Sequence, residues 1–393
     1  MLPQAASTPV IASQRVVSLD QFRGWTVLAM AFVNYLGSFK EILPVFKHHH
    51  SYFSFADAVM PQFFFAVGFA YRLTFLKNLE RLGWSGAVAR VIRRFLGLFL
   101  IALIVHQLSG SVGTWEDLKR LTFPEFLEKA CKRSLFQTLT HIAVTSLWVL
   151  PVIGLGFWPR LFFAAGSGLL HLWLSFRFNY QWVHADPTGI DGGPLGFLTW
   201  TIPLIFGSFA LDWTAHSQGE RPGQSKKNPL IPILAWALGL MLLGYGLSCL
   251  NLQFSSSQGS KVQLPGQWAP HPAGRLFLEP PFFPPTEPKN IWTMSQRAGS
   301  LTYLLFGAGF SLATYAVFVV FCDRLKWSWS VLATLGGNAL VAYILLGMLE
   351  DTFHKYTPKD SPLWFALSTW VMEITLCWAI LRSLEKQGVR IRM

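Results

Sequence analysis

Charged residues are scarce in this chain. Asp, Glu, Lys and Arg make up 13% of its 393 residues, and 52% of the residues are hydrophobic. Typical soluble domains contain roughly 25% charged residues, so the composition argues against an ordinary soluble fold. Apolar runs of about 17 to 25 residues, the length that crosses a bilayer, recur from end to end. The sequence therefore predicts a polytopic membrane protein.

Cysteine is also rare. The four cysteines, at positions 131, 249, 322 and 377, lie far apart in the sequence, which indicates neither a disulfide framework nor a CxxC metal site. We therefore expect no metal. The apolar core of a cleavable signal is missing from residues 1–14. We expect a flexible N-terminus there, followed by a single transmembrane domain over residues 15–393.

Runs without charge predict an all-α fold of about ten transmembrane helices. The predicted spans lie near residues 24–38, 57–76, 91–109, 134–153, 157–176, 195–213, 229–250, 298–322, 330–349 and 363–381.

Basic residues between the spans indicate the orientation. The stretch from Arg72 to Arg94 carries six Lys or Arg and one acid, which marks a cytoplasmic side. Alternation then places both termini in the cytoplasm and the histidines at 48–50 outside. The segment 110–133 is an exception, because it puts five basic residues outside. This orientation signal accounts for much of the net charge of +12, so we expect no nucleic-acid partner.

A proline-rich stretch at about 251–295 also falls on the outer side. It contains too much proline for a helix or a central strand. Its aromatic residues exceed what a disordered linker should hold. We therefore predict an ordered loop over the outer mouth of the bundle, with a solvated linker as the alternative. The aromatic residues are Trp268, Phe277, Phe282, Phe283 and Trp292.

The first span carries polar residues at both ends. Asp20 and Arg23 are three residues apart, so on a helix they share a face and can pair. The guanidinium of Arg23 is also suited to binding a phosphate. Asn34 lies about 16 Å further along the helix. An amide inside a membrane is often only a contact between helices.

Three adjacent histidines precede Asp57, which opens an almost wholly apolar run. A metal site is the weakest interpretation, because adjacent side chains diverge. The rings are otherwise incidental loop residues, or one of them is a general base suited to proton transfer near neutral pH. A carboxylate in such a run is costly. Asp57 either lies at a helix start, where the dipole lowers that cost, or hydrogen-bonds a histidine.

Several motifs in order resemble the transmembrane acetyltransferase family of heparan-alpha-glucosaminide N-acetyltransferase. The first is SLDQFRGWTVLAMAFVNY, followed by FKH and by AD with FFFAVG beyond it. RRFLGLFLIALIV, SLFQTLTHIAV, GIDGGPLGFLTWTIPLIFG, KNIWTMSQ and GGNALVAYIL follow in the family's order. The likeness covers nearly the whole chain.

The resemblance implies transfer of an acetyl group from cytoplasmic acetyl-CoA to an amino sugar such as glucosamine, or a related cell-envelope glycan, on the far side of the membrane. We expect a bacterial inner-membrane protein with a periplasmic histidine loop, in contact with membrane lipids. The family also suggests a homodimer. Arg23 and Arg94 are the residues we expect near the phosphates of acetyl-CoA.

In the family, an Asn of the first span and a His of the following outer loop are held to be the catalytic pair. The Asn corresponds to Asn34. The motif FKH selects His48, whereas spacing to Tyr52 selects His49, and His50 stays a third candidate. The ring acts as a general base or accepts the acetyl group first. We expect Asn34 to donate to the oxyanion and Asp57 to orient the base.

Four further residues are candidates for substrate binding. Asp191 and Gly192 match the family's acidic segment and either contact a sugar or form a tight turn. Asn290 and Trp292 open the next motif, where the indole can stack on a sugar or anchor the chain at the interface. Two other functions compete. One is a proton-coupled transporter or carrier of a sugar or lipid-linked substrate, and the other is an O-acyltransferase of the same architecture.

Overall fold

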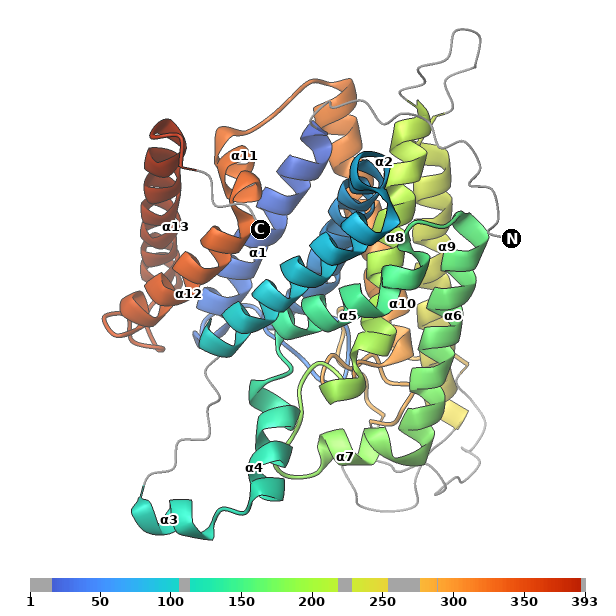
Figure 1. Cartoon of the computed structure of the whole chain (residues 1–393). Coiled ribbons are helices and arrows are strands. Elements are labelled where there is room, and N and C mark those ends of the chain that lie inside the picture. Colours follow the sequence, from blue (N-terminus) through green and yellow to red (C-terminus); the bar gives the residue numbers. More distant parts are fainter. Residues whose placement is uncertain (1–15, 106–113, 218–227, 254–275, 288, 390–393) are drawn as a thin grey trace, which may run out of the picture.

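The computed structural model describes residues 16–105, 114–217, 228–253, 276–287 and 289–389. Over these ranges the chain is helical and contains no strand (Figure 1), as the sequence predicted. The expected flexible N-terminus and Trp268 lie outside the described residues.

Within the described residues, ten main helices form the bundle, two short helices lie in a connection, and a third short helix continues one of the main helices. The main helices are α1 (Val17–Gly37), α2 (Phe55–Val105), α5 (Thr138–Ile153), α6 (Phe157–Leu174), α8 (Phe197–Ser217), α9 (Leu230–Ser248), α10 (Leu301–Phe318), α11 (Ser330–Gly337), α12 (Ala339–His354) and α13 (Leu363–Lys386). The short ones are α3 (Trp115–Arg120), α4 (Phe123–Lys129) and α7 (Tyr180–His184), which continues α6.

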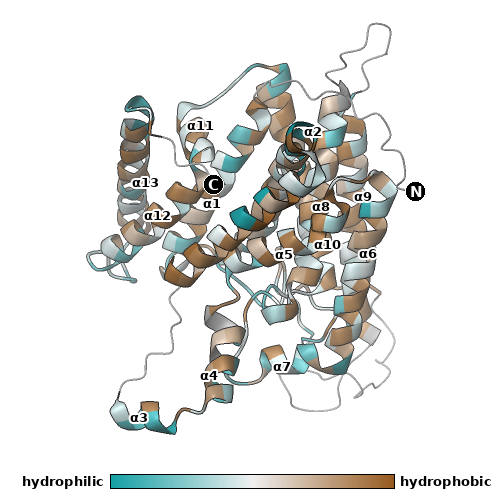
Figure 2. Cartoon of the chain, in the orientation of Figure 1, coloured by the Kyte–Doolittle hydropathy of each residue, from teal (hydrophilic) through white to brown (hydrophobic). Residues whose placement is uncertain are grey.

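Five helical segments of the described chain are long and apolar enough to cross a bilayer, and the bent pair of α11 and α12, at 98°, makes a sixth if it is one span. The five are Phe157–His184, Gly193–Ala215, Leu230–Leu252, Leu301–Arg324 and Leu363–Lys386. Figure 2 shows hydrophobic residues along most of α9 and α10. The chain is thus an integral membrane protein. A total of ten spans and cytoplasmic termini stay predictions.

The second and third predicted spans are two helical segments that meet at Gly83 within α2. The backbone there is not helical, with φ at 69° and ψ at −178°, so the expected break is present as a sharp kink, although no loop separates the two segments. Glycine adopts this left-handed conformation without steric cost. Arg72, counted among the basic residues of the break, is instead buried within the bundle.

Close backbone contact holds α11 against α1. A Cβ atom at Gly24 would overlap the carbonyl of Leu332, and one at Gly336 would overlap the carbonyl of Asp20. Only glycine allows helices to approach this closely. The contact fixes the junction of α11 and α12, including Asn338, beside the first span.

The described part of the proline-rich loop packs on the bundle. The N–H of Phe282 donates to the carbonyl of Phe53 at 2.8 Å, and the two rings lie 5.7 Å apart. Phe277 and Phe283 are exposed. The segment is therefore anchored mainly by Phe282, and its position over an outer mouth stays a prediction.

Candidate functional site

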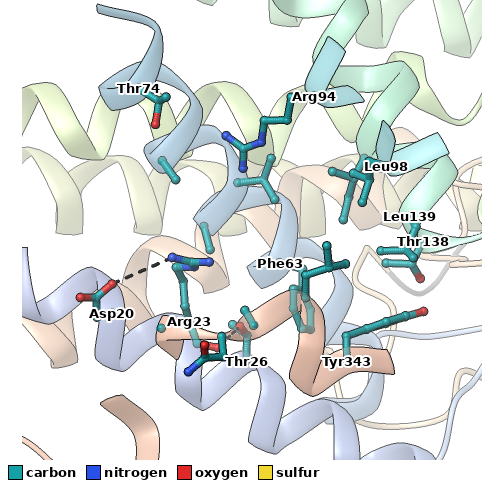
Figure 3. A pocket seen from close by; sticks show the side chains of 18 of the residues that line it. Asp20, Arg23, Thr26, Phe63, Thr74, Arg94, Leu98, Thr138, Leu139 and Tyr343 are labelled. Carbon is teal, nitrogen blue, oxygen red and sulfur yellow. Dashed lines mark hydrogen bonds and ion pairs between the residues drawn. The ribbon is translucent and has the colours of Figure 1, made fainter. Parts of the chain in front are cut away.

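A cavity of about 600 Å³ lies between α1, α2, α5 and the junction of α11 and α12. Arg23 from α1 and Arg94 from the far half of α2 both line it. Figure 3 shows the two guanidinium groups reaching toward each other. Asp20 pairs with Arg23 at 4.0 Å, as its spacing predicted. Two cations that are 71 positions apart in the sequence thus share one space, where they can bind an anion.

The other end of this cavity carries hydroxyl groups. Thr138 and Tyr343 line it there (Figure 3). The charge of Asp191 acts on Tyr343. The cavity therefore runs from a cationic end toward the neighbourhood of Asp191.

Asn34 lies on the same stripe of α1 as the cavity residues Arg23 and Thr26. Eleven residues make about three helical turns, so positions 23 and 34 point in nearly the same direction, about 16 Å apart. The side chain of Asn34 is exposed although it belongs to an apolar helix. Asn34 does not line the cavity itself.

His48 and Asp57 form a hydrogen-bonded pair. Nδ1 of His48 lies 3.0 Å from Oδ1 of Asp57. The other carboxylate oxygen accepts from the hydroxyl and the N–H of Ser54, at 2.7 and 3.2 Å, and from the N–H of His49 at 3.3 Å. Asp57 is 1% exposed and lies in the first turn of α2. Asp57 therefore lies at a helix start and also bonds a histidine, so both alternatives suggested by the sequence hold at once.

This pairing prepares the His48 ring for base chemistry. With Asp57 accepting the Nδ1 proton, Nε2 is the nitrogen that carries the lone pair. Burial lowers the pKa of His48, but the hydrogen bond and charge of Asp57, the charge of Asp191 and the nearby Gln296 together raise the pKa above 6.5. The side chain is nevertheless 41% exposed. It can meet a substrate while its counter-ion stays buried.

The other two histidines have different surroundings from those of His48. Nε2 of His49 donates to the carbonyl of Pro44 at 2.8 Å, and its ring stacks on Tyr52 at 4.2 Å. Burial and the charges of Arg297 and Lys289 lower the pKa of His50 to about 4. A base this weak is poorly matched to proton transfer near neutral pH. The geometry therefore favours His48 over His49 and His50.

Asp191 is a buried acid beside His48. It is 3% exposed, and Nε2 of Gln296 donates to its Oδ1 at 3.0 Å. Burial raises the pKa of Asp191 to about 7, although Gln296 and His48 act in the opposite direction. Gln296 thus bonds Asp191 and lies near His48. We did not single out Gln296 from the sequence, although it ends the motif KNIWTMSQ.

The backbone at Asp191 and Gly192 forms the tight turn that we considered as an alternative. Their φ angles are 55° and 85°, both left-handed. The N–H of Gly192 donates to the carbonyl of Arg297 at 2.9 Å, and Trp200 donates to the carbonyl of Asp191 at 3.0 Å. Gly192 therefore shapes the turn, and Asp191 alone brings a side chain to the site.

Asn290 and Trp292 form a turn of their own. The amide of Asn290 donates to the carbonyl of Asn251 at 3.3 Å, and its oxygen accepts from the N–H of Trp292 at 2.9 Å. The indole packs against Phe176, with ring centroids 6.2 Å apart. These contacts give Asn290 a structural role, and a sugar contact of Trp292 stays a prediction.

The sequence matches no known protein family and no curated protein. Among the described residues, no group of three or more His, Cys, Asp or Glu has an arrangement that could hold a metal ion. The candidate site therefore has two parts. One is the cavity with Arg23 and Arg94, and the other is the group of polar residues His48, Asp57, Asp191 and Gln296.

Proposed function

We propose that this protein is a transmembrane acyltransferase, which moves an acetyl group from cytoplasmic acetyl-CoA to an amino sugar or related glycan on the periplasmic side of a bacterial inner membrane. One observation carries the proposal. A cavity with two arginines at one end leads toward a buried Asp191, which accepts a hydrogen bond from Gln296 and whose charge acts on His48, the partner of Asp57. The family resemblance supports the same reaction and a dimeric assembly.

The arginines suit the donor. Acetyl-CoA carries phosphates, and guanidinium groups bind phosphate through strong, charge-assisted hydrogen bonds. With the phosphates at Arg23 and Arg94, the pantetheine arm would pass Thr26 and Phe63 toward Thr138 and Tyr343, all of which line the cavity. The thioester would then approach the group of polar residues around His48.

The histidine suits the acceptor. Nε2 of His48 would take a proton from the acceptor's ammonium group, because only the neutral amine attacks a carbonyl. The C–N bond then forms, the C–S bond breaks, and the imidazolium returns its proton to the CoA sulfur. The second proton of the attacking nitrogen passes to the neutral ring and then to solvent. The amide of Asn34 would donate to the oxyanion. In the alternative order, the ring of His48 accepts the acetyl group first and passes it on.

The donor site is tested with purified protein, labelled acetyl-CoA and glucosamine. We expect Arg23→Gln and Arg94→Gln each to raise KM for acetyl-CoA about 10- to 100-fold, because each removes a charge-assisted hydrogen bond to a phosphate. Arg93→Gln is the matched control, since Arg93 is exposed and does not line the cavity. The absence of acetyl transfer to any amine or hydroxyl acceptor would favour the transporter.

The pH dependence of kcat/KM reports the base. His48 must be neutral to act, so its raised pKa predicts that activity falls as the pH drops through a value above 6.5. In Asp57→Asn the carboxylate that raises this pKa is gone. The acidic limb of the pH profile of kcat/KM should therefore move to lower pH in this variant, and the maximal rate should be lower.

His50→Gln provides the control for this pH profile. With a pKa of about 4, His50 stays neutral across the range from about pH 5 to 8 in which an ordinary histidine titrates. Replacing His50 should therefore leave the acidic limb of the pH profile at the same pH as in the wild type. An unshifted limb in Asp57→Asn would contradict a base held by Asp57.

A further inference from the structure

A second hollow, of about 420 Å³, lies on the outside of the bundle at the end of α10 and shares no residue with the arginine cavity. Its lining is almost wholly apolar. Val317, Trp327 and Trp329, which line it, are 51%, 51% and 47% exposed. In a membrane protein, exposed apolar surface faces the acyl chains of lipids, and a hollow in that surface can hold one of them. The other large lining residues are Trp25, Phe318 and Phe321.

The groove lies at one boundary of the membrane. The span Leu301–Arg324 ends beside it, and Arg324 and Lys326 follow, both exposed. The rings of Trp327 and Trp329 come next, 4.9 Å apart. Tryptophans and basic residues in this order are typical of the level of the lipid headgroups.

The walls of the groove are fixed in place. The N–H of Trp329 donates to Oε1 of Gln21 at 3.1 Å, and its carbonyl accepts from Nε2 of Gln21 at 3.0 Å. Trp25 donates to Gln62 of α2 at 3.1 Å. The groove is therefore preformed, and little ordering is needed for a ligand to bind.

Charge identifies the occupant. Arg324 and Lys326 lie in the chain between Cys322 and Trp327, which both line the groove, and basic residues near a membrane surface attract anionic lipids. Arg324 also donates to Oδ1 of Asn228, and the nearby acid, Asp323, is half-buried. We propose that the groove binds one acyl chain of an anionic glycerophospholipid, whose phosphate contacts Arg324 and Lys326. This site does not depend on the proposed function.

Native mass spectrometry of the delipidated full chain tests the proposal. The probes are phosphatidylglycerol and phosphatidylcholine with identical acyl chains. We expect the chain to retain one phosphatidylglycerol, and to retain phosphatidylcholine at least several-fold less. The double variant Arg324→Gln and Lys326→Gln should remove most of this preference, since each charge contributes about fivefold in affinity.

A groove-filling variant locates the acyl chain. Val317→Trp should abolish selective retention, whereas Val371→Trp should not, because Val371 is equally exposed, at 52%, on α13. Equal retention of both lipids by the wild type, or unchanged retention in Val317→Trp, would overturn the proposal. The proposal would also be overturned if the protein were a dimer that Val317→Trp disrupts and Val371→Trp does not, because a second copy would then occupy the groove.

Discussion

His48→Ala is expected to lower the rate of acetyl transfer to glucosamine by about 100- to 10,000-fold, the range for loss of a positioned general base. The effect should be largest at this histidine because its ring is the one whose Nδ1 lies 3.0 Å from Asp57. With Nδ1 held, Nε2 is the nitrogen that can take the acceptor's proton. Single-turnover measurements with labelled acetyl-CoA report the chemical step directly.

His49→Ala is the matched control. His49 contacts Asp57 through its backbone N–H, at 3.3 Å, and alanine keeps that bond. The ring of His49 is bonded to the carbonyl of Pro44 and stacked on Tyr52, so its loss should affect the stability of the loop more than the rate. We expect most of the activity to remain in His49→Ala and in His50→Ala.

The acetyl-histidine route is distinguishable in the same experiment. Without acceptor, wild-type protein would accumulate label on His48 if the ring carries the acetyl group, and would stay unlabelled if the ring is only a base. Undiminished turnover in all three alanine variants would contradict both routes.

The helices could be predicted from the sequence because a bilayer imposes long apolar runs. The span predicted at 229–250 corresponds to α9, Leu230–Ser248. The break between the second and third predicted spans is confirmed by the non-helical kink at Gly83. Its sharpness could not be predicted, since the polar residues around Gly83 suit a loop and a helix surface equally well, and local propensity is only a weak guide to tertiary packing.

The candidate site was predicted only in part. The sequence provides Asp57 and three histidines, but the choice of His48 depends on how Ser54 and the N–H of His49 hold the carboxylate. The contact of Gln296 with Asp191 joins residues 105 positions apart. Such contacts follow from the packing of the bundle, which hydrophobic periodicity does not specify.

The basic residues were also interpreted too simply. Arg72 was counted as an orientation signal, yet Arg72 and a second arginine, Arg160, are 5% and 0% exposed. Both guanidinium groups bond the carboxylate of Asp212, with Nε of Arg72 at 2.7 Å from Oδ1 and Arg160 on Oδ2. The contact joins α2, α6 and α8. An orientation rule that counts charges does not distinguish a solvated cation from one that is paired inside the bundle.

Asp212→Asn should therefore destabilise the fold strongly. The amide leaves two buried cations without their counter-ion, and breaking a buried ion pair costs about 3 to 5 kcal/mol. The remaining contacts are to neutral groups and do not replace the charge. Arg160 donates to Ser208 and to the carbonyl of Gly156, and Arg72 donates to the carbonyls of Ile153 and Leu155. Thermal unfolding of the purified protein in detergent measures the loss, together with the yield of folded protein.

Asp20→Asn is the control with the same chemical change. Asp20 also pairs with an arginine, but the distance to Arg23 is 4.0 Å and the two side chains are 17% and 32% exposed. Water can solvate both groups, so the expected change in the free energy of unfolding is at most about 1 kcal/mol. Equal stability of the two variants would mean that water or neighbouring carbonyls solvate Arg72 and Arg160 well enough without Asp212. In that case the three helices would be held together by their apolar contacts alone.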